Sequence, residues 1–144
     1  MPYIKIWIHL IFSTKNREKI IANELKLKLL SHIKENSIAK NIFINTLNCV
    51  EDHIHILFSL GNDQTISKVA QLIKGESSFW LNKNKLIKGK FEWQEEYIAV
   101  SVSESQINKV REYIKNQEEH HRRKSFAEEF GELIKKYGFT KFSK

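Results

Sequence analysis

Apolar residues alternate with polar or aromatic ones along several short stretches of the chain. In residues 3–13 every second position from Ile4 to Phe12 holds an apolar side chain. This period of two is typical of a β-strand with one buried face. Three more stretches favour strands, namely 41–50, 53–60 and 97–102. The short Glu51-Asp52 link predicts a hairpin between the second and third strands.

Helical spacing of apolar residues marks the segments between these strands. Residues 23–37 form the first predicted helix, and residues 65–81 form the second, with Gly75 predicting a bend. The sequence Ser103-Glu104-Ser105-Gln106 matches a capping box. It predicts the start of a third helix, which is expected to run to about His121.

A last helix is predicted over residues 126–137. The resulting order is strand, helix, strand, strand, helix, strand, and then helices. That order is typical of an α+β, ferredoxin-like (RRM-like) fold, in which a four-stranded antiparallel sheet carries helices on one face. The C-terminal helices would be an addition to it. We interpret residues 1–144 as one domain, because length and composition give no sign of a second.

Composition excludes several classes of protein. Hydrophobic residues make up 41% of the chain, which is enough for a globular core. Apolar runs are far too short to span a membrane, and the N-terminus lacks the features of a signal peptide. Cys49 is the single cysteine, so no internal disulfide can form, and we expect Cys49 in the core. These features favour a cytoplasmic protein.

Charge points to a polyanionic partner. The chain has 24 Lys and Arg against 17 Asp and Glu, a formal net charge of +7. A small basic domain of this kind is a suitable partner for nucleic acid. The predicted phosphate contacts lie in three basic segments and are Lys15, Arg17, Lys83, Lys85, Lys88, Lys90, Arg122, Arg123 and Lys124.

A pair of histidines on the third predicted strand is the first candidate for chemistry. His53 and His55 are two residues apart, so both rings project from the same face of the sheet. Two adjacent imidazoles are half of a divalent metal site. The alternative is a pair of exposed polar residues on an open face. His9 on the first strand shares that face, and we expect it to support a ligand or contact DNA.

A tyrosine and a glutamine on the third predicted helix are the second candidate. Tyr113 and Gln117 are four residues apart and share one helix face, at the edge of its apolar stripe. A tyrosine hydroxyl becomes a nucleophile when a metal or a base assists it, and Gln117 offers a hard oxygen ligand. The alternative is a tyrosine that packs its ring on the sheet. His120 is expected near the metal or DNA, whereas His121 is expected to pack.

These motifs resemble those of the HUH enzymes. Glu51-Asp52-His53-Ile54-His55-Ile56-Leu57 resembles their His-hydrophobic-His motif. Tyr113-Ile114-Lys115-Asn116-Gln117 resembles the tyrosine helix of their single-tyrosine branch, which holds small transposases of minimal bacterial insertion sequences and REP-associated tyrosine transposases. Residues 7–17, 74–78, 93–94 and 97–103 agree. The resemblance covers about residues 3–130.

The resemblance implies a transposase that cleaves and rejoins single-stranded DNA at hairpin-bearing element ends. Tyr113 would attack a backbone phosphate, retain the 5′ end as a phosphotyrosine and release a 3′ hydroxyl. His53, His55 and Gln117 would bind Mg²⁺ or Mn²⁺. The resemblance also implies a homodimer with composite active sites, in which the tyrosine helix of one subunit reaches the histidine pair of the other.

Two alternatives stay open at the level of sequence. A domesticated REP-processing tyrosine nuclease would share all of this chemistry. A non-catalytic module that binds single-stranded nucleic acid could use the same ferredoxin-like fold, but it would need stacking aromatic residues on the two central strands. The first strand offers Trp7 there, whereas the third strand offers His53 and His55.

Overall fold

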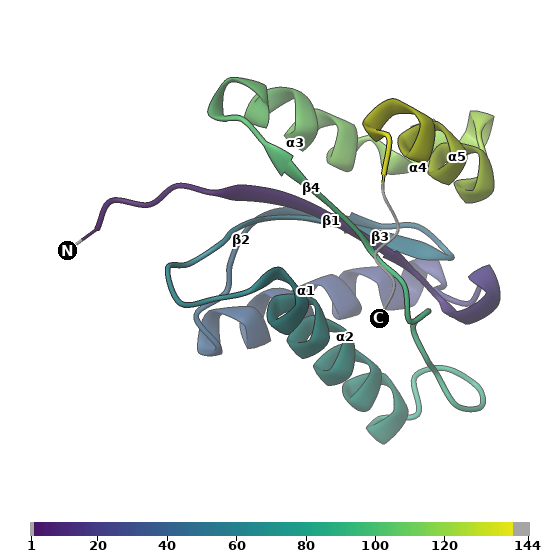
Figure 1. Cartoon of the computed structure of the whole chain (residues 1–144). Helices are drawn as coiled ribbons and strands as arrows, with labels where there is room; N and C mark the ends of the chain where they lie inside the picture. Colours follow the sequence, from purple (N-terminus) through teal and green to yellow (C-terminus); the bar gives the residue numbers. More distant parts are fainter. Residues whose placement is uncertain (1, 140–144) are drawn as a thin grey trace.

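Four antiparallel strands form one sheet in the computed structural model, which describes residues 2–139. The strands are β1 (Trp7–Ser13), β2 (Phe43–Cys49), β3 (His53–Ser59) and β4 (Ile98–Val102). Their order across the sheet is β2-β3-β1-β4, so β1 and β3 are central and β2 and β4 are the edges. The predicted α+β, ferredoxin-like order of elements is confirmed (Figure 1).

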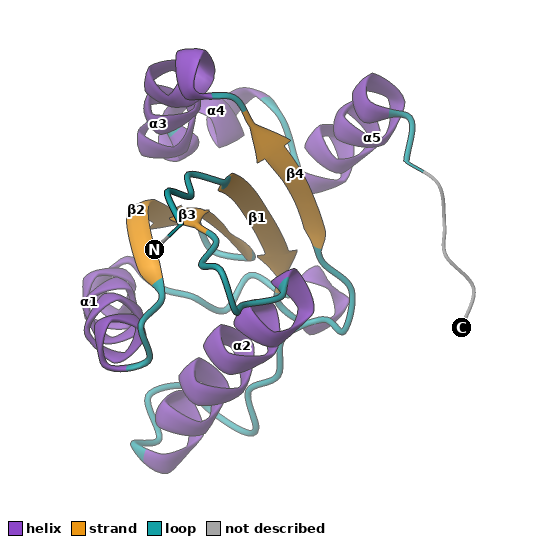
Figure 2. Ribbon diagram, turned by 60° about the vertical axis from the view of Figure 1, so that its left-hand side comes forward, coloured by secondary structure: helices purple, strands orange, loops and turns teal. Residues whose placement is uncertain are grey.

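Helices cover both faces of this sheet (Figures 1 and 2). One face packs against α1 (Asn23–Ala39) and α2 (Ile66–Lys83). The other lies under three C-terminal helices, α3 (Ile107–Lys115), α4 (Gln117–Arg123) and α5 (Phe126–Tyr137). Within residues 2–139 no helix is both long and apolar enough to cross a membrane.

The alternation along the central strands decides which residues meet which helices. Ile54, Ile56 and Phe58 of β3 belong to the main core with α1 and α2, as does the buried Cys49 of β2. The intervening residues of β3 therefore face the C-terminal helices. The histidine pair lies on a central strand, near the end of the sheet where β3 begins and β1 finishes, because His53 pairs with Ser13 and His55 with Ile11.

One predicted boundary and one predicted bend are wrong. The first strand begins at Trp7 and not at residue 3, because Trp7 pairs with Ser59, the last residue of β3. Gly75 does not bend α2, which runs unbroken from Ile66 to Lys83. Glycine weakens a helix by about 1 kcal/mol, but buried side chains on either side of Gly75, such as Ile73, hold α2 on the sheet.

The third predicted helix is also wrong, both at its start and in its length. Ser103 makes no side-chain cap, and a 3₁₀ turn (Glu104–Gln106) precedes α3. The helix then breaks at Asn116, where α4 begins in a new direction. Asn48 of β2 explains the break, because its Nδ2 lies 2.9 Å from the carbonyl oxygen of Ile114 and 3.2 Å from that of Lys115. Asn48 thus contacts two carbonyl oxygens that would accept hydrogen bonds from backbone N–H groups if the helix were continuous.

Candidate metal centre and tyrosine site

Three imidazoles and one carboxylate meet between the sheet and the C-terminal helices. His53 and His55 come from β3, His121 from α4 and Glu129 from α5. One donor atom of each lies within 4.8 Å of the donor atoms of the others. Both strand histidines are 0% exposed. The expectation that they lie on an open face is therefore wrong, because α3–α5 cover that face and the ring of Phe126 stacks on His53.

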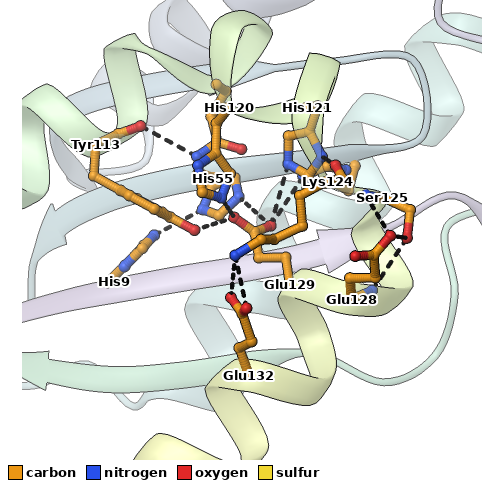
Figure 3. Close-up of polar contacts among 12 residues, drawn as sticks. His9, His55, Tyr113, His120, His121, Lys124, Ser125, Glu128, Glu129 and Glu132 are labelled. Atoms are coloured by element: carbon orange, nitrogen blue, oxygen red, sulfur yellow. Dashed lines mark hydrogen bonds and ion pairs between the residues drawn. The ribbon is translucent and has the colours of Figure 1, made fainter.

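Glu129 lies at the centre of this cluster (Figure 3). Its Oε1 is 3.4 Å from Nε2 of His53 and 3.3 Å from Nε2 of both His55 and His121. Its Oε2 accepts a hydrogen bond from the Tyr113 hydroxyl and lies 3.4 Å from Nε2 of His120. One carboxylate thus connects the histidines to the candidate nucleophile.

The sequence interpretation missed Glu129. A signal was present, because Glu129 falls within the apolar stripe of α5 between Phe126 and Leu133. An acidic residue at such a position becomes buried, here to 1% exposure, and buried acids are rarely left unpaired. The sequence interpretation gave His121 only a packing role, whereas in the structure its Nε2 also faces Glu129. That interpretation assumed a continuous helix, but the break at Asn116 turns His121 toward Glu129.

Outer contacts orient the histidine rings. Nδ1 of His53 lies 2.7 Å from Oδ1 of Asp52, and Nδ1 of His121 lies 2.8 Å from the carbonyl oxygen of Lys124. Nε2 of His9 lies 2.9 Å from Nδ1 of His55, so His9 contacts the pair from β1. Contacts of this kind fix the ring orientation of metal-ligating histidines.

The pKa values of the buried histidines are shifted in different directions. Burial, together with the neighbouring His55, lowers the pKa of His9 to about 3. Burial also lowers the pKa of His55 to about 4, so both rings are neutral at neutral pH. Burial acts in the same direction on His53, but the hydrogen bond to Asp52 and the nearby Glu129 carboxylate outweigh it and raise the pKa of His53.

The carboxylate and the tyrosine also have shifted pKa values. Burial alone would raise the pKa of Glu129, but the surrounding histidines lower it far below its usual range, so Glu129 is ionised. Burial and the hydrogen bond to Glu129 raise the pKa of the Tyr113 hydroxyl. A phenol in this state is a weak nucleophile until its proton has an acceptor.

Gln117 lies next to these groups at the start of α4. Its side chain is fully buried, and its Nε2 donates to the Tyr113 carbonyl oxygen at 3.1 Å. The ring of Tyr113 lies 5.6 Å from that of His55 and 5.1 Å from that of His120. The structure therefore brings Tyr113, Gln117, His120 and the histidine pair together within one chain.

A groove of about 670 Å³ leads to this site from the surface. Tyr113, His120 and Glu129 line its inner end. Lys109 of α3 and Lys136 of α5 also line the groove and are exposed. These two lysines were not among the predicted phosphate contacts.

The predicted basic residues do not gather at the groove. Lys83, Lys85, Lys88 and Lys90 lie at the end of α2 and in the loop after it, on the other side of the sheet. Several of the rest are paired with acidic residues: Lys15 with Glu92, Arg122 and Arg123 with Glu119, and Lys124 with Glu132. Arg17 lies over the rings of Phe126 and Phe130. Their contact with DNA stays a prediction.

Trp7 does not provide a stacking platform. It is 6% exposed and packs with Leu57, Ile107 and Ile114 beneath α3. A ferredoxin-like module that binds nucleic acid on its sheet needs exposed aromatic residues on the central strands. The covered sheet therefore disfavours the non-catalytic alternative.

Comparison with known proteins finds matches to transposases. The family model described as "Transposase IS200 like" matches residues 3–117. The chain is 26% identical over 115 residues to the ISDra2 transposase TnpA of Deinococcus radiodurans, covering 76% of this chain and 81% of the relative. It is 28% identical over 115 residues to the transposase for insertion sequence element IS200 of Salmonella typhimurium, covering 76% and 74%.

Two solved structures share the fold. A candidate transposase of Deinococcus radiodurans aligns with a TM-score of 0.65 and 23% identity, over 81% of this chain and 93% of that chain. A REP-associated tyrosine transposase bound to a REP hairpin aligns with a TM-score of 0.64 and 18% identity, over 84% of this chain and 72% of that chain. At these identities the likeness concerns the fold.

Proposed function

Since the chain belongs to the IS200-like transposase family, we propose that this transposase cleaves and rejoins single-stranded DNA with Tyr113 as its nucleophile. The observation that carries the proposal is the partly buried hydrogen bond from the Tyr113 hydroxyl to Glu129, next to the histidine pair. A phenol, a proton acceptor and a set of metal donors are the groups that attack on a phosphodiester needs.

The proposed cleavage step begins at the Tyr113 oxygen. Its proton passes to Oε2 of Glu129 as the oxygen bonds to phosphorus. This transfer is needed because the raised pKa keeps the phenol protonated until a base accepts its proton. The bond from phosphorus to the 3′ oxygen breaks, and this oxygen leaves as a hydroxyl after taking a proton from solvent. The 5′ phosphate stays on Tyr113. Attack by a second 3′ hydroxyl reverses the step and joins two DNA ends.

His53, His55 and Gln117 are proposed to hold a divalent ion, Mg²⁺ or Mn²⁺. The residues fit such an ion, because Nε2 of His53 and Oε1 of Gln117 are buried and have no hydrogen-bond partner among residues 2–139. Buried polar atoms without partners are rare and call for a ligand or ion. A bound ion would supply positive charge that polarises the scissile phosphate.

The assay that tests this function uses single-stranded DNA from the two ends of the genomic locus that encodes the protein. We expect a covalent protein–DNA adduct that survives denaturation and depends on a divalent ion. Hairpin-forming ends are the proposed substrate, in line with the REP-associated relative that is bound to a REP hairpin. Failure of any such DNA to form an adduct, with metal present and the protein folded, would contradict the proposal.

The groove beside Tyr113 is the proposed path of the DNA strand. Replacing Lys109 and Lys136 together by Gln should weaken single-stranded DNA binding by roughly 10-fold, because each lysine neutralises a backbone phosphate. The slope of affinity against salt concentration should also become shallower. Fluorescence anisotropy at several salt concentrations measures both quantities.

The matched control for the groove is Lys28→Gln/Lys34→Gln, which removes the same charge from exposed positions of α1 on the other face of the sheet. This control should keep most of its affinity. Equal losses in the two double variants would mean that net charge, and not the groove, binds the strand.

We also propose a two-fold homodimer with composite active sites. The chain places Tyr113 next to its own His55, and exchange of α3 between subunits would keep the same contacts across the dimer. The edge strands β2 and β4 offer pairing surfaces for the two sheets. The segment Ser103–Gln106 would act as the hinge.

Mixing two inactive variants tests the exchange. Tyr113→Phe protein combined with His53→Ala/His55→Ala protein should regain roughly a quarter of wild-type cleavage, because half of the dimers are mixed and one of their two sites is intact. Sites built within one subunit would leave the mixture inactive. An inactive mixture after demonstrated subunit exchange would therefore refute the composite site, and a monomer in light scattering with DNA present would refute the dimer.

A further inference from the structure

His53 and His121 each direct Nε2, as an unprotonated nitrogen, toward the carboxylate of Glu129. Nδ1 of His53 donates to Asp52, and Nδ1 of His121 donates to the carbonyl oxygen of Lys124. Both partners can only accept a hydrogen bond. The ring proton of each neutral histidine is therefore on Nδ1, and Nε2 carries a lone pair.

These lone pairs point at a negative charge in a buried place. Nε2 of His53 and of His121 lie 3.4 and 3.3 Å from Oε1 of Glu129, and neither has a hydrogen-bond partner among residues 2–139. Buried nitrogens without a partner are rare and call for a ligand or ion. Together with the carboxylate oxygen they form a cluster of donor atoms of the kind that holds a metal ion.

The ring of His55 can adopt the same tautomer, with its proton on Nδ1. Nε2 of His55 also lies 3.3 Å from Oε1 of Glu129, while its Nδ1 lies 2.9 Å from Nε2 of His9. When Nδ1–H of His55 donates to His9, Nε2 of His55 carries a lone pair as well. Donor atoms about 3.0–3.4 Å apart are what adjacent ligands show around one ion with bonds near 2.1 Å.

We propose that His53, His55, His121 and Glu129 form a site that binds a first-row transition-metal ion such as Mn²⁺ in preference to Mg²⁺. This inference rests on the proposed function only in taking the same site as the metal centre. It adds two ligands, His121 and Glu129, which lie beyond residues 3–117 matched by the family model. Imidazole suits transition metals, whereas Mg²⁺ requires mainly oxygen ligands and holds its waters tightly.

Metal titration of the full chain without DNA tests the site. Mn²⁺ is added to metal-free protein, and free Mn²⁺ is measured by electron paramagnetic resonance. We expect one tight site per chain that a large molar excess of Mg²⁺ does not empty. Spin-echo modulation should show three imidazole nitrogens on the bound ion.

Three variants assign the ligands. His121→Ala and Glu129→Gln should each weaken Mn²⁺ binding by more than about 10-fold, since loss of a supporting contact alone costs 10- to 100-fold. Glu132→Gln, which removes an exposed carboxylate three residues further along α5, should bind Mn²⁺ as the wild type does. Circular dichroism checks that each variant is folded. If one variant does not fold, the number of imidazole nitrogens on Mn²⁺ bound to the wild-type protein still tests the site.

Two results would overturn the inference. One is wild-type Mn²⁺ affinity in both His121→Ala and Glu129→Gln, which would leave the site to the histidine pair and Gln117. The other is displacement of Mn²⁺ by Mg²⁺ at equal concentration. Because DNA is absent from the titration, a negative result there does not bear on the chemistry of Tyr113. A wild-type protein that binds Mn²⁺ as expected but does not cleave DNA would instead contradict the proposed function.

Discussion

Tyr113→Phe is expected to abolish the covalent protein–DNA adduct while the fold and DNA binding persist. The change removes one oxygen and keeps the ring that packs near His55 and His120. Glu129 loses one donor, which should cost stability by only about 1 kcal/mol. Without its nucleophile an enzyme loses activity by at least about 1,000-fold. Denaturing gels with labelled DNA measure the adduct, and anisotropy measures binding.

The matched control is Tyr97→Phe. Tyr97 is 38% exposed and lines a separate pocket with Ile98 and Phe126. This variant should form the adduct at the wild-type level. An adduct that persists in Tyr113→Phe and disappears in Tyr97→Phe would show that the nucleophile has been assigned to the wrong tyrosine.

Local sequence pattern was sufficient for the sheet and for the strand residues of the site. Alternation along residues 53–58 places Ile54 and Ile56 in the core, which puts His53 and His55 on the opposite face, as predicted. The period of a strand is a property of the backbone, so it can be read without knowledge of neighbours. The same holds for His9, two residues before Ile11 on the paired strand.

The rest of the site depends on contacts between distant parts of the chain. The helix break at Asn116 results from Asn48, which lies 66 residues before Ile114. Without that contact, helical periodicity continues through Gln117 and assigns His121 to the wrong face. Glu129 then comes to the site only because α4 ends and α5 packs Phe126 on His53.

Charge predicted a polyanionic partner but not where it would lie. Basic residues are spread along the chain, and only the fold decides which of them share a surface. The loop that contains Lys85 and Lys88 looks like a strong phosphate site in sequence, yet it follows α2 on the side of the sheet away from Tyr113. Lys109 and Lys136, which line the groove, lie far apart in the sequence, on α3 and α5.

His55→Ala is expected both to remove metal-dependent cleavage and to destabilise the protein. Had the pair been on an open face, the loss of stability would have been small. In the structure His55 is fully buried between His9, Tyr113 and Glu129. Its removal leaves a cavity and breaks the buried hydrogen bond with His9, together costing about 2–4 kcal/mol. Thermal unfolding of the metal-free protein should show a melting temperature lower by roughly 5–10 °C.

His32→Ala is the comparison that separates these two effects. His32 lies on the other face of the sheet, stacks on Trp80 and pairs with Glu76 near the surface. Its loss should lower the melting temperature less and leave cleavage intact. If His55→Ala melted at the wild-type temperature, the C-terminal helices could not be covering the histidine pair in solution. Glu129 would then not be buried beside Tyr113, and its assignment as the proton acceptor of Tyr113 would be wrong.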